Sequence, residues 1–254
     1  METGRMRRTL QTVRRGLADV LFPPTCVACH GIVERATVDA PGLRHLCSRC
    51  APLVDRVQPP HCTICGHPFF GMLDGERTCP HCEGLHPAFS EGRTVTLFKG
   101  PARALVIELK YHRGLYVLHD MEELMRGNLH VMEFVRGATL VPVPLHSRKA
   151  RERGYNQALC LAEAFARAAG GATRVETAIK RMIDTETQTA FDRRTRMHNL
   201  KNAFALAPGR TINPASRYIL VDDVFTTGST LNSCAHVLRD AGALNLGVVT
   251  FAHG

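Results

Sequence analysis

Four Cys-x-x-Cys pairs between residues 26 and 82 constrain this chain more than any other feature of its sequence. One such turn presents two thiolates to a metal ion, and a second turn completes a tetrahedral site. The sequence therefore predicts two Zn(Cys)4 sites. Sequential pairing of neighbouring turns is the simplest arrangement, and interleaved pairing of the first turn with the third stays open. The expected ligands are Cys26, Cys29, Cys47, Cys50, Cys62, Cys65, Cys79 and Cys82.

The cellular compartment bears on the interpretation of these cysteines. No apolar run approaches the ~18 to 20 residues of a membrane span, and the N-terminus lacks the apolar stretch of a signal peptide. We therefore expect a cytoplasmic protein without integral membrane association, in which paired cysteines bind metal more often than they form disulfides. Redox catalysis by one pair is a functional alternative, but four pairs so close together favour metal.

Composition excludes a disordered or repetitive chain. With 254 residues, of which 44% are apolar, the chain can bury a substantial core. Its formal charge is +9, and two Zn(Cys)4 sites of charge 2− would reduce this to about +5.

Three regions follow from the patterning. Residues 1–24 predict a basic amphipathic helix that ends at Pro23-Pro24, and we interpret it as a cap on the metal module rather than a membrane or nucleic-acid element. Residues 25–88 form the double zinc-ribbon-like module. From residue 89 to 254 strands and helices alternate, which indicates a parallel sheet. Strands are expected at 93–98, 139–144, 218–221 and 247–252, and helices at 101–110, 117–127, 155–169 and 229–240.

The most informative stretch runs from Tyr218 to Thr230. An apolar strand ends in Asp222 and Asp223, and a Thr-Thr-Gly-Ser-Thr loop then opens a helix. In open α/β folds, ligands bind at this carboxyl edge of the sheet. Hydroxyls and amides at a helix N-terminus suit a phosphate, and adjacent carboxylates accept hydrogen bonds from ribose hydroxyls. Simple helix capping by Asp223 and Thr226 is the structural alternative, which the paired acids make less favourable.

This stretch resembles the phosphoribosyl-pyrophosphate (PRPP) motif of type I phosphoribosyltransferases. The resemblance extends over nearly the whole chain to the ComF family, the group of competence protein F and GntX-like proteins. Further matching segments are Leu109-Lys110-Tyr111, Val141-Pro142-Val143-Pro144, Arg153-Gly154-Tyr155-Asn156-Gln157 and the region from Thr187 to Phe204. Tyr155 is a mild departure, because the family commonly has Phe there.

The resemblance implies an α/β fold: a type I phosphoribosyltransferase-like parallel sheet with flanking helices, preceded by a small Cys-rich zinc-binding domain. It also implies site residues. Asp222 and Asp223 resemble the ribose-binding acids, and residues 183–198 resemble a mobile hood. The 5-phosphate loop would comprise Thr226, Thr227, Gly228, Ser229 and Thr230. The pyrophosphate side would comprise Arg148, Lys149, Arg151 and Arg153, with Lys110 as a weaker candidate. Four cations so close together suit a diphosphate, although they could also form a solvated turn.

Family membership would imply a PRPP-binding protein of DNA uptake and natural transformation, with Mg²⁺ accompanying PRPP. Single-stranded DNA and the DNA-uptake helicase machinery would be its partners. An active phosphoribosyltransferase that transfers the 5-phosphoribosyl group from PRPP to an unknown acceptor is the alternative, and the catalytic residues are not identified. Because aromatic residues make up 6% of the chain and Trp is absent, no base-stacking platform is evident. A pocket sized for one phosphoribosyl group also touches too few phosphates to release many counterions, so we expect DNA and PRPP to use separate surfaces. If DNA follows the N-terminal helix and the zinc module, Arg7, Arg8, Arg14 and Arg15 would contact it.

Overall fold

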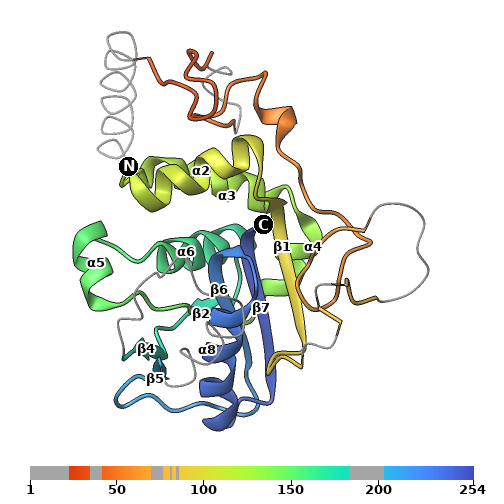
Figure 1. Ribbon diagram of the computed structural model, residues 1–254, viewed down its shortest axis with the longest axis vertical. Coiled ribbons are helices and arrows are strands. Elements are labelled where there is room, and N and C mark those ends of the chain that lie inside the picture. Colours follow the sequence, from red (N-terminus) through yellow and green to blue (C-terminus); the bar gives the residue numbers. More distant parts are fainter. Residues whose placement is uncertain (1–22, 35–41, 70–76, 81, 84–85, 183–202) are drawn as a thin grey trace, which may run out of the picture.

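A five-stranded parallel sheet lies at the centre of the computed structural model (Figure 1). Its strand order is β1-β7-β6-β2-β3, and every pairing within it is parallel. The strands are β1 (Glu91–Leu97), β7 (Asn245–His253), β6 (Arg217–Phe225), β2 (Thr139–Pro142) and β3 (Arg174–Val175). A separate antiparallel pair is formed by β4 (Ile179–Arg181) and β5 (Phe204–Leu206).

The structure describes residues 23–34, 42–69, 77–80, 82–83, 86–182 and 203–254. The expected N-terminal helix, with Arg7, Arg8, Arg14 and Arg15, lies outside the described residues. The expected hood over 183–198 also lies outside them.

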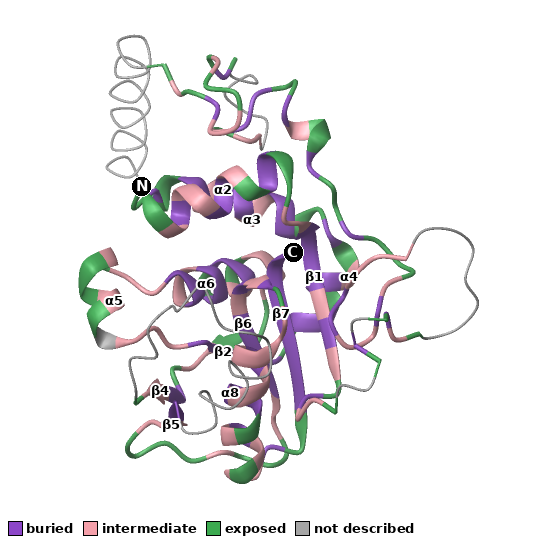
Figure 2. Ribbon diagram, in the orientation of Figure 1, coloured by how far each residue is buried: buried purple, intermediate pink, exposed green. Residues whose placement is uncertain are grey.

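The two faces of the sheet bury different cores, as the two-residue period of a strand requires. Ile219 and Val221 of β6 face one core, whereas Tyr218 and Leu220 face the other. The first core contains α2 (Gly100–Tyr111), α3 (Leu118–Arg126), α4 (Leu129–Val135) and α6 (Gln157–Ala169). The second contains α8 (Ser229–Asp240) together with β4 and β5. Figure 2 shows that burial is concentrated in the sheet and in the helix faces that cover it.

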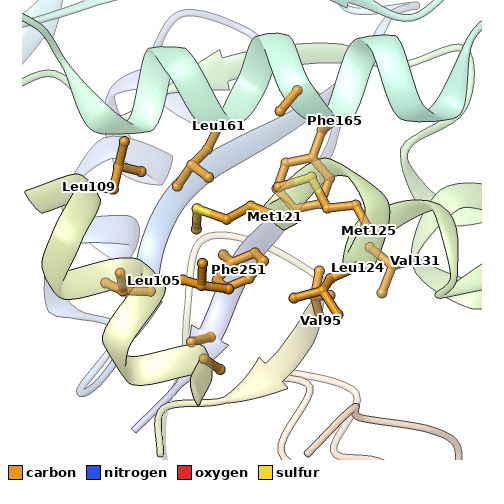
Figure 3. Packing of buried hydrophobic residues seen from close by; sticks show 14 of the residues in the cluster. Val95, Leu105, Leu109, Met121, Leu124, Met125, Val131, Leu161, Phe165 and Phe251 are labelled. Carbon is orange, nitrogen blue, oxygen red and sulfur yellow. The ribbon is translucent and has the colours of Figure 1, made fainter. Parts of the chain in front are cut away.

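The first core joins four helices to the middle of the sheet. Figure 3 shows Leu105 of α2, Met121 of α3 and Phe165 of α6 converging around Phe251 of β7. All four side chains are fully buried. This core therefore fixes the middle of α2 over the sheet.

Each Cys group belongs to a different core. Cys26, Cys47 and Cys50 join the core of α2 and α3, whereas the second group joins the core of α8. The connecting chain crosses the outer edge of β1, where Arg56 pairs with Thr96 in an antiparallel bridge. Hydrogen bonds from Val57 N to Val95 O and from Leu97 N to Asp55 O, both 2.9 Å, fix this crossing. The metal module thus covers a sheet edge that would otherwise expose unpaired backbone groups.

Most of the expected elements are present, with three differences. The strand with the acid pair continues to Phe225, because it pairs with β7 along its whole length. The basic segment at 148–153 lies in a short helix, α5 (Ser147–Arg153), which ends at Gly154 with a φ of 84°. Helix α4 and the strands β3, β4 and β5 were not expected. The three strands are only two or three residues long, which is too short to show a two-residue period in the sequence.

A buried carboxylate joins the first Cys group to the helical layer. Asp120 of α3 is fully buried and accepts hydrogen bonds from Arg44 N and His45 N, both at 2.8 Å. Val27 N in turn donates to His45 O at 2.9 Å, which ties in the chain beside Cys26. The side chain of one helical residue therefore satisfies two backbone donors of the module.

We expect Asp120→Ala to destabilise the protein by about 1–3 kcal/mol, because it leaves two part-buried N–H groups without their acceptor. Thermal unfolding followed by circular dichroism should show a lower Tm, and a colorimetric chelator should remove zinc faster than from the parent. Asp120→Asn keeps one acceptor and should give an intermediate result. A parental Tm for the Ala variant would contradict this role.

Candidate functional site

The eight clustered cysteines form two groups with the geometry of metal sites. In each group the four Sγ atoms lie within 4.8 Å of one another. Cys29 and Cys47 Sγ are 3.7 Å apart, as are Cys65 and Cys79 Sγ. Tetrahedral Zn–S bonds of about 2.3 Å require sulfur–sulfur distances of about 3.8 Å, so both groups fit zinc. The pairing is sequential: Cys26, Cys29, Cys47 and Cys50 form one group, and Cys62, Cys65, Cys79 and Cys82 form the other.

Backbone donors and a glycine turn shape the second group. Cys79 N donates to Cys62 Sγ at 3.3 Å, and His67 N donates to Cys65 Sγ at 3.4 Å. These bonds stabilise thiolates, which are the form that binds zinc. Gly66 has a φ of 73°, and a Cβ there would lie 2.7 Å from Thr94 N of β1. The turn after Cys65 therefore needs glycine to rest directly on the strand.

The acid pair lies near the carboxyl end of β6, beside the end of α2. Asp223 is 4% exposed, and its Oδ1 accepts a hydrogen bond from Lys110 Nζ at 2.8 Å. Asp222 Oδ1 accepts one from Asp223 N at 2.8 Å. The structure thus brings Lys110 and the two acids together, although Lys110 is 113 residues away in sequence.

Neither acid is fully stabilised by its described neighbours. Burial, reinforced by the charge of Asp223, raises the pKa of Asp222 to about 7. Asp223 Oδ2 is buried and has no hydrogen-bond partner among the described residues. A buried carboxylate oxygen without a donor is costly, so this atom is suited to accept a hydrogen bond from a ligand hydroxyl.

The loop from Thr226 to Thr230 joins the acid-bearing strand to α8. Gly228 is the N-cap of α8 and has a left-handed φ of 71°. A Cβ at this position would lie 2.7 Å from Cζ of Phe225, so only glycine fits over that ring. Thr227 and Ser229 hydroxyls lie 2.9 Å apart. These hydroxyls and the N–H groups of the first turn of α8 are donors of the type that binds anions, and the 5-phosphate role of this loop stays a prediction.

The expected pyrophosphate residues lie on α5, which packs beside the C-terminal end of α2 (Figure 1). Arg153 stacks over the ring of Tyr111, with 5.4 Å between the guanidinium carbon and the ring centroid. Its Nη1 atom is buried without a hydrogen-bond partner among the described residues. By contrast, Arg148 pairs with Glu152 on its own helix at 3.3 Å, and Arg151 is exposed. Arg153 thus contacts the residue that directly follows Lys110.

The Arg-Gly-Tyr-Asn-Gln segment fixes the surrounding elements. Tyr155 Oη donates a hydrogen bond to Leu109 O of α2. Asn156 Nδ2 donates to Val143 O beyond β2 at 3.0 Å, and its Oδ1 caps α6 by accepting from Ala158 N at 3.0 Å. This segment holds the ends of α2 and β2 in place around the acid pair.

Two residues near the site were not identified from sequence. Arg181 of β4 is close enough that its positive charge opposes the rise in the pKa of Asp222. His253, at the end of β7, stacks on Phe225 with ring centroids 5.2 Å apart, and His67 packs against His253 at 4.8 Å. The sequence offered no signal for either contact, since the partners lie on different elements.

A cavity of about 550 Å³ lies away from the acid pair, between the first Cys group and α2. Val27, Leu53, Ala104 and Ile107 give it apolar walls, and Glu108 borders it. It contains none of the expected PRPP-binding residues.

Comparison with known proteins places this architecture in a family. The family model described as double zinc ribbon domain matches residues 17–83. DNA utilization protein YhgH of Salmonella typhimurium is 32% identical over 208 residues, which cover 80% of this chain and 88% of that protein. Competence protein F of Haemophilus influenzae is 28% identical over 85% of this chain and 91% of its own length. The chain belongs to the ComF family. Competence protein ComFC of Bacillus subtilis is a more distant relative, at 21% identity over 78% of this chain and 79% of that protein.

The double zinc ribbon and the parallel sheet with flanking helices are thus confirmed for this ComF family chain. A solved hypoxanthine phosphoribosyltransferase from Staphylococcus aureus is similar over 52% of this chain and 62% of that one, with a TM-score of 0.33 and 14% identity. None of the helices that the structure describes is long and apolar enough to cross a membrane.

We expect elemental analysis to find about two Zn per chain. Cys62→Ser should lower the content to about one, because it removes a ligand from the second group alone. Cys160→Ser is the matched control, since Cys160 lies in α6 outside both groups and should leave two. A metal-free chain that still shows the parental Tm would contradict the zinc assignment.

A second prediction concerns Asp222 and pH. Its folded pKa of about 7 lies above the usual value, so folding stability is lost as pH rises from about 4 through 7 and the carboxyl ionises. Asp222 is half-buried, so solvent screens part of the cost of ionising its carboxyl group. Asp222→Asn should therefore raise the free energy of unfolding at pH 8 by about 1–3 kcal/mol. At pH 4 the two proteins should unfold at nearly the same temperature. A variant less stable than the parent at pH 8 would show that the carboxylate is stabilised instead.

Proposed function

We propose that this ComF family chain binds PRPP with Mg²⁺ at the carboxyl end of β6 and acts in DNA uptake with single-stranded DNA as its partner. The observation that carries the proposal is the acid pair: Asp223 is buried, and its Oδ2 has no donor in the part of the chain that the structure describes. The pair lies on the strand that leads into the loop capped by Gly228 at the start of α8. Ribose hydroxyls supply the missing donors. The 5-phosphate fits the N–H groups and hydroxyls of residues 226–230.

The diphosphate end of PRPP would face the corner between α2 and α5. Lys110 uses one donor on Asp223 and has two left, and Arg153 has a buried Nη1 without a partner among the described residues. Lys149 and Arg151 add positive charge on α5. Bound Mg²⁺ would neutralise part of the diphosphate charge, which keeps the acid pair and the anion compatible at short range.

The names of the relatives support the DNA role, because they are called competence proteins and DNA utilization proteins. The alternative function, phosphoribosyl transfer, would use the same binding residues. In that reaction the bond from C1 of the ribose to the diphosphate breaks, and a bond forms to an acceptor. Diphosphate release that depends on an added nucleobase would favour this alternative.

We expect the double variant Asp222→Asn with Asp223→Asn to weaken PRPP binding by roughly 100-fold or more, because two charge-assisted hydrogen-bond sites become neutral. Isothermal titration calorimetry with PRPP and Mg²⁺ measures this, and circular dichroism checks the fold. The matched control is Asp240→Asn, an exposed carboxylate at the far end of α8 that should leave the affinity unchanged. Parental affinity in the double variant would end the assignment of this site.

A further inference from the structure

We propose that single-stranded DNA binds across the corner formed by residues 108–116 and α5, with a base stacked on Tyr111. We call this surface the tyrosine corner. The inference deepens the proposed function, because it rests on DNA as a partner and assigns the surface that contacts it. It differs from the sequence-based expectation, which placed DNA and PRPP on separate surfaces.

Large apolar side chains are exposed together at this corner. Tyr111 is 65% exposed, Tyr116 49% and Leu115 45%. They follow one another at the end of α2 and in η2 (Leu115–Val117), and Figure 2 shows the adjoining α5 as largely exposed. Tyr116 packs its ring against His45, with centroids 4.5 Å apart, and donates its hydroxyl to Glu108 Oε1 at 2.7 Å, so Tyr111 has the more open ring. Large exposed apolar groups close together in the chain indicate an interaction surface. Two of the four tyrosines in the chain lie here, so a low aromatic content is still compatible with base stacking.

The segments that form this corner are rich in positive charge. Residues 108–116 and 147–153 contain six Lys and Arg side chains and two carboxylates. Arg113 Nη2 donates to Glu152 O at 2.8 Å, which ties the end of α2 to α5. A cationic surface with exposed aromatic rings is the usual platform for an unpaired strand, because phosphates contact the cations while bases stack on the rings.

The stacking residue is held in place. The guanidinium carbon of Arg153 lies 5.4 Å from the centroid of the Tyr111 ring, and Tyr111 as a whole residue is still 65% exposed. Directly before it, Lys110 is anchored by Asp223 and Leu109 O by the hydroxyl of Tyr155. A ring on a fixed helical turn loses little freedom when a base stacks on it. Such stacking needs an unpaired base face, which favours a single strand over a duplex.

The tyrosine corner adjoins the acid pair through consecutive residues. Lys110 contacts Asp223, and Tyr111 follows it with Arg153 above its ring. Arg153 is therefore placed to contact either a DNA phosphate or the diphosphate of PRPP. A strand on this corner would end beside the PRPP pocket rather than on a separate face.

Fluorescence anisotropy with a labelled oligo(dT) of roughly 20 nucleotides tests the proposal, since this length exceeds the site size of most single-strand-binding folds. Tyr111→Ala should weaken binding by about 5- to 100-fold, which corresponds to removing one stacked base. Tyr111→Phe keeps the ring and should bind within about twofold of the parent. Replacing Arg151 and Arg153 by Gln should flatten the dependence of log K on log salt by about 0.7 for each phosphate that the protein no longer neutralises. Arg136→Gln, an exposed arginine after α4, is the matched control and should leave both affinity and slope unchanged.

The outcomes separate this inference from the proposed function. Loss of DNA binding in Tyr111→Ala with parental PRPP binding supports the tyrosine corner. If the Asp222 and Asp223 double variant still binds PRPP while Tyr111→Ala loses DNA, the PRPP proposal fails and the corner stands. Parental DNA binding by Tyr111→Ala overturns the corner, as does equal binding of the parent to a duplex of the same length. Loss of DNA binding only after replacement of Arg7, Arg8, Arg14 and Arg15 would likewise place the strand elsewhere.

Discussion

Thiolate coordination is the interaction on which the N-terminal third of this protein depends. Among the described residues from 23 to 90, the buried apolar side chains other than Cys are Val33, Leu46, Val54, Val57 and Phe89. So small a core cannot order a segment of this length, whereas two Zn(Cys)4 sites can, because metal binding supplies folding free energy directly. The ordered module also contributes to the packing of the sheet. The ordered module crosses the edge of β1 between its two Cys groups, and it contributes buried residues to the cores on both faces.

At the acid pair the requirements of folding and of binding oppose each other. Burial, followed by repulsion from the adjacent carboxylate of Asp223, raises the pKa of Asp222. Lys110 offsets part of this cost through its bond to Asp223, and the positive charge of Arg181 acts in the same direction. One carboxylate oxygen nevertheless stays without a donor among the described residues. This cost to stability supports the proposed binding role, in which a ligand hydroxyl would supply the donor.

The Cys groups, the principal strands and the loop at α8 could be predicted from the sequence, because each depends on residues close together in the chain. Cys-x-x-Cys spacing restricts which sulfurs can share an ion, and the Tyr218–Thr230 segment contains a strand, a turn and a helix start in one stretch. Contacts between distant segments were not predictable in this way. The pairing of Lys110 with Asp223 spans 113 residues, and the stacking of Arg153 on Tyr111 depends on where α5 packs. The absence of a stacking platform was inferred from composition, which says nothing about which tyrosines are exposed.

The second Cys group and the loop at α8 lie at the two ends of one series of contacts. Gly228 rests on the ring of Phe225, where a Cβ would lie only 2.7 Å from Cζ. His253 supports that ring from β7, and His67 packs against His253 while its N–H donates to Cys65 Sγ. A shift of the metal-binding turn would move His67 and, through His253, the ring of Phe225 on which Gly228 rests. The loop would move as well, because close-packed interiors leave no space to absorb the change. The zinc ribbon is thus part of the scaffold that positions the loop, which gives a physical reason for the two units to occur on one chain.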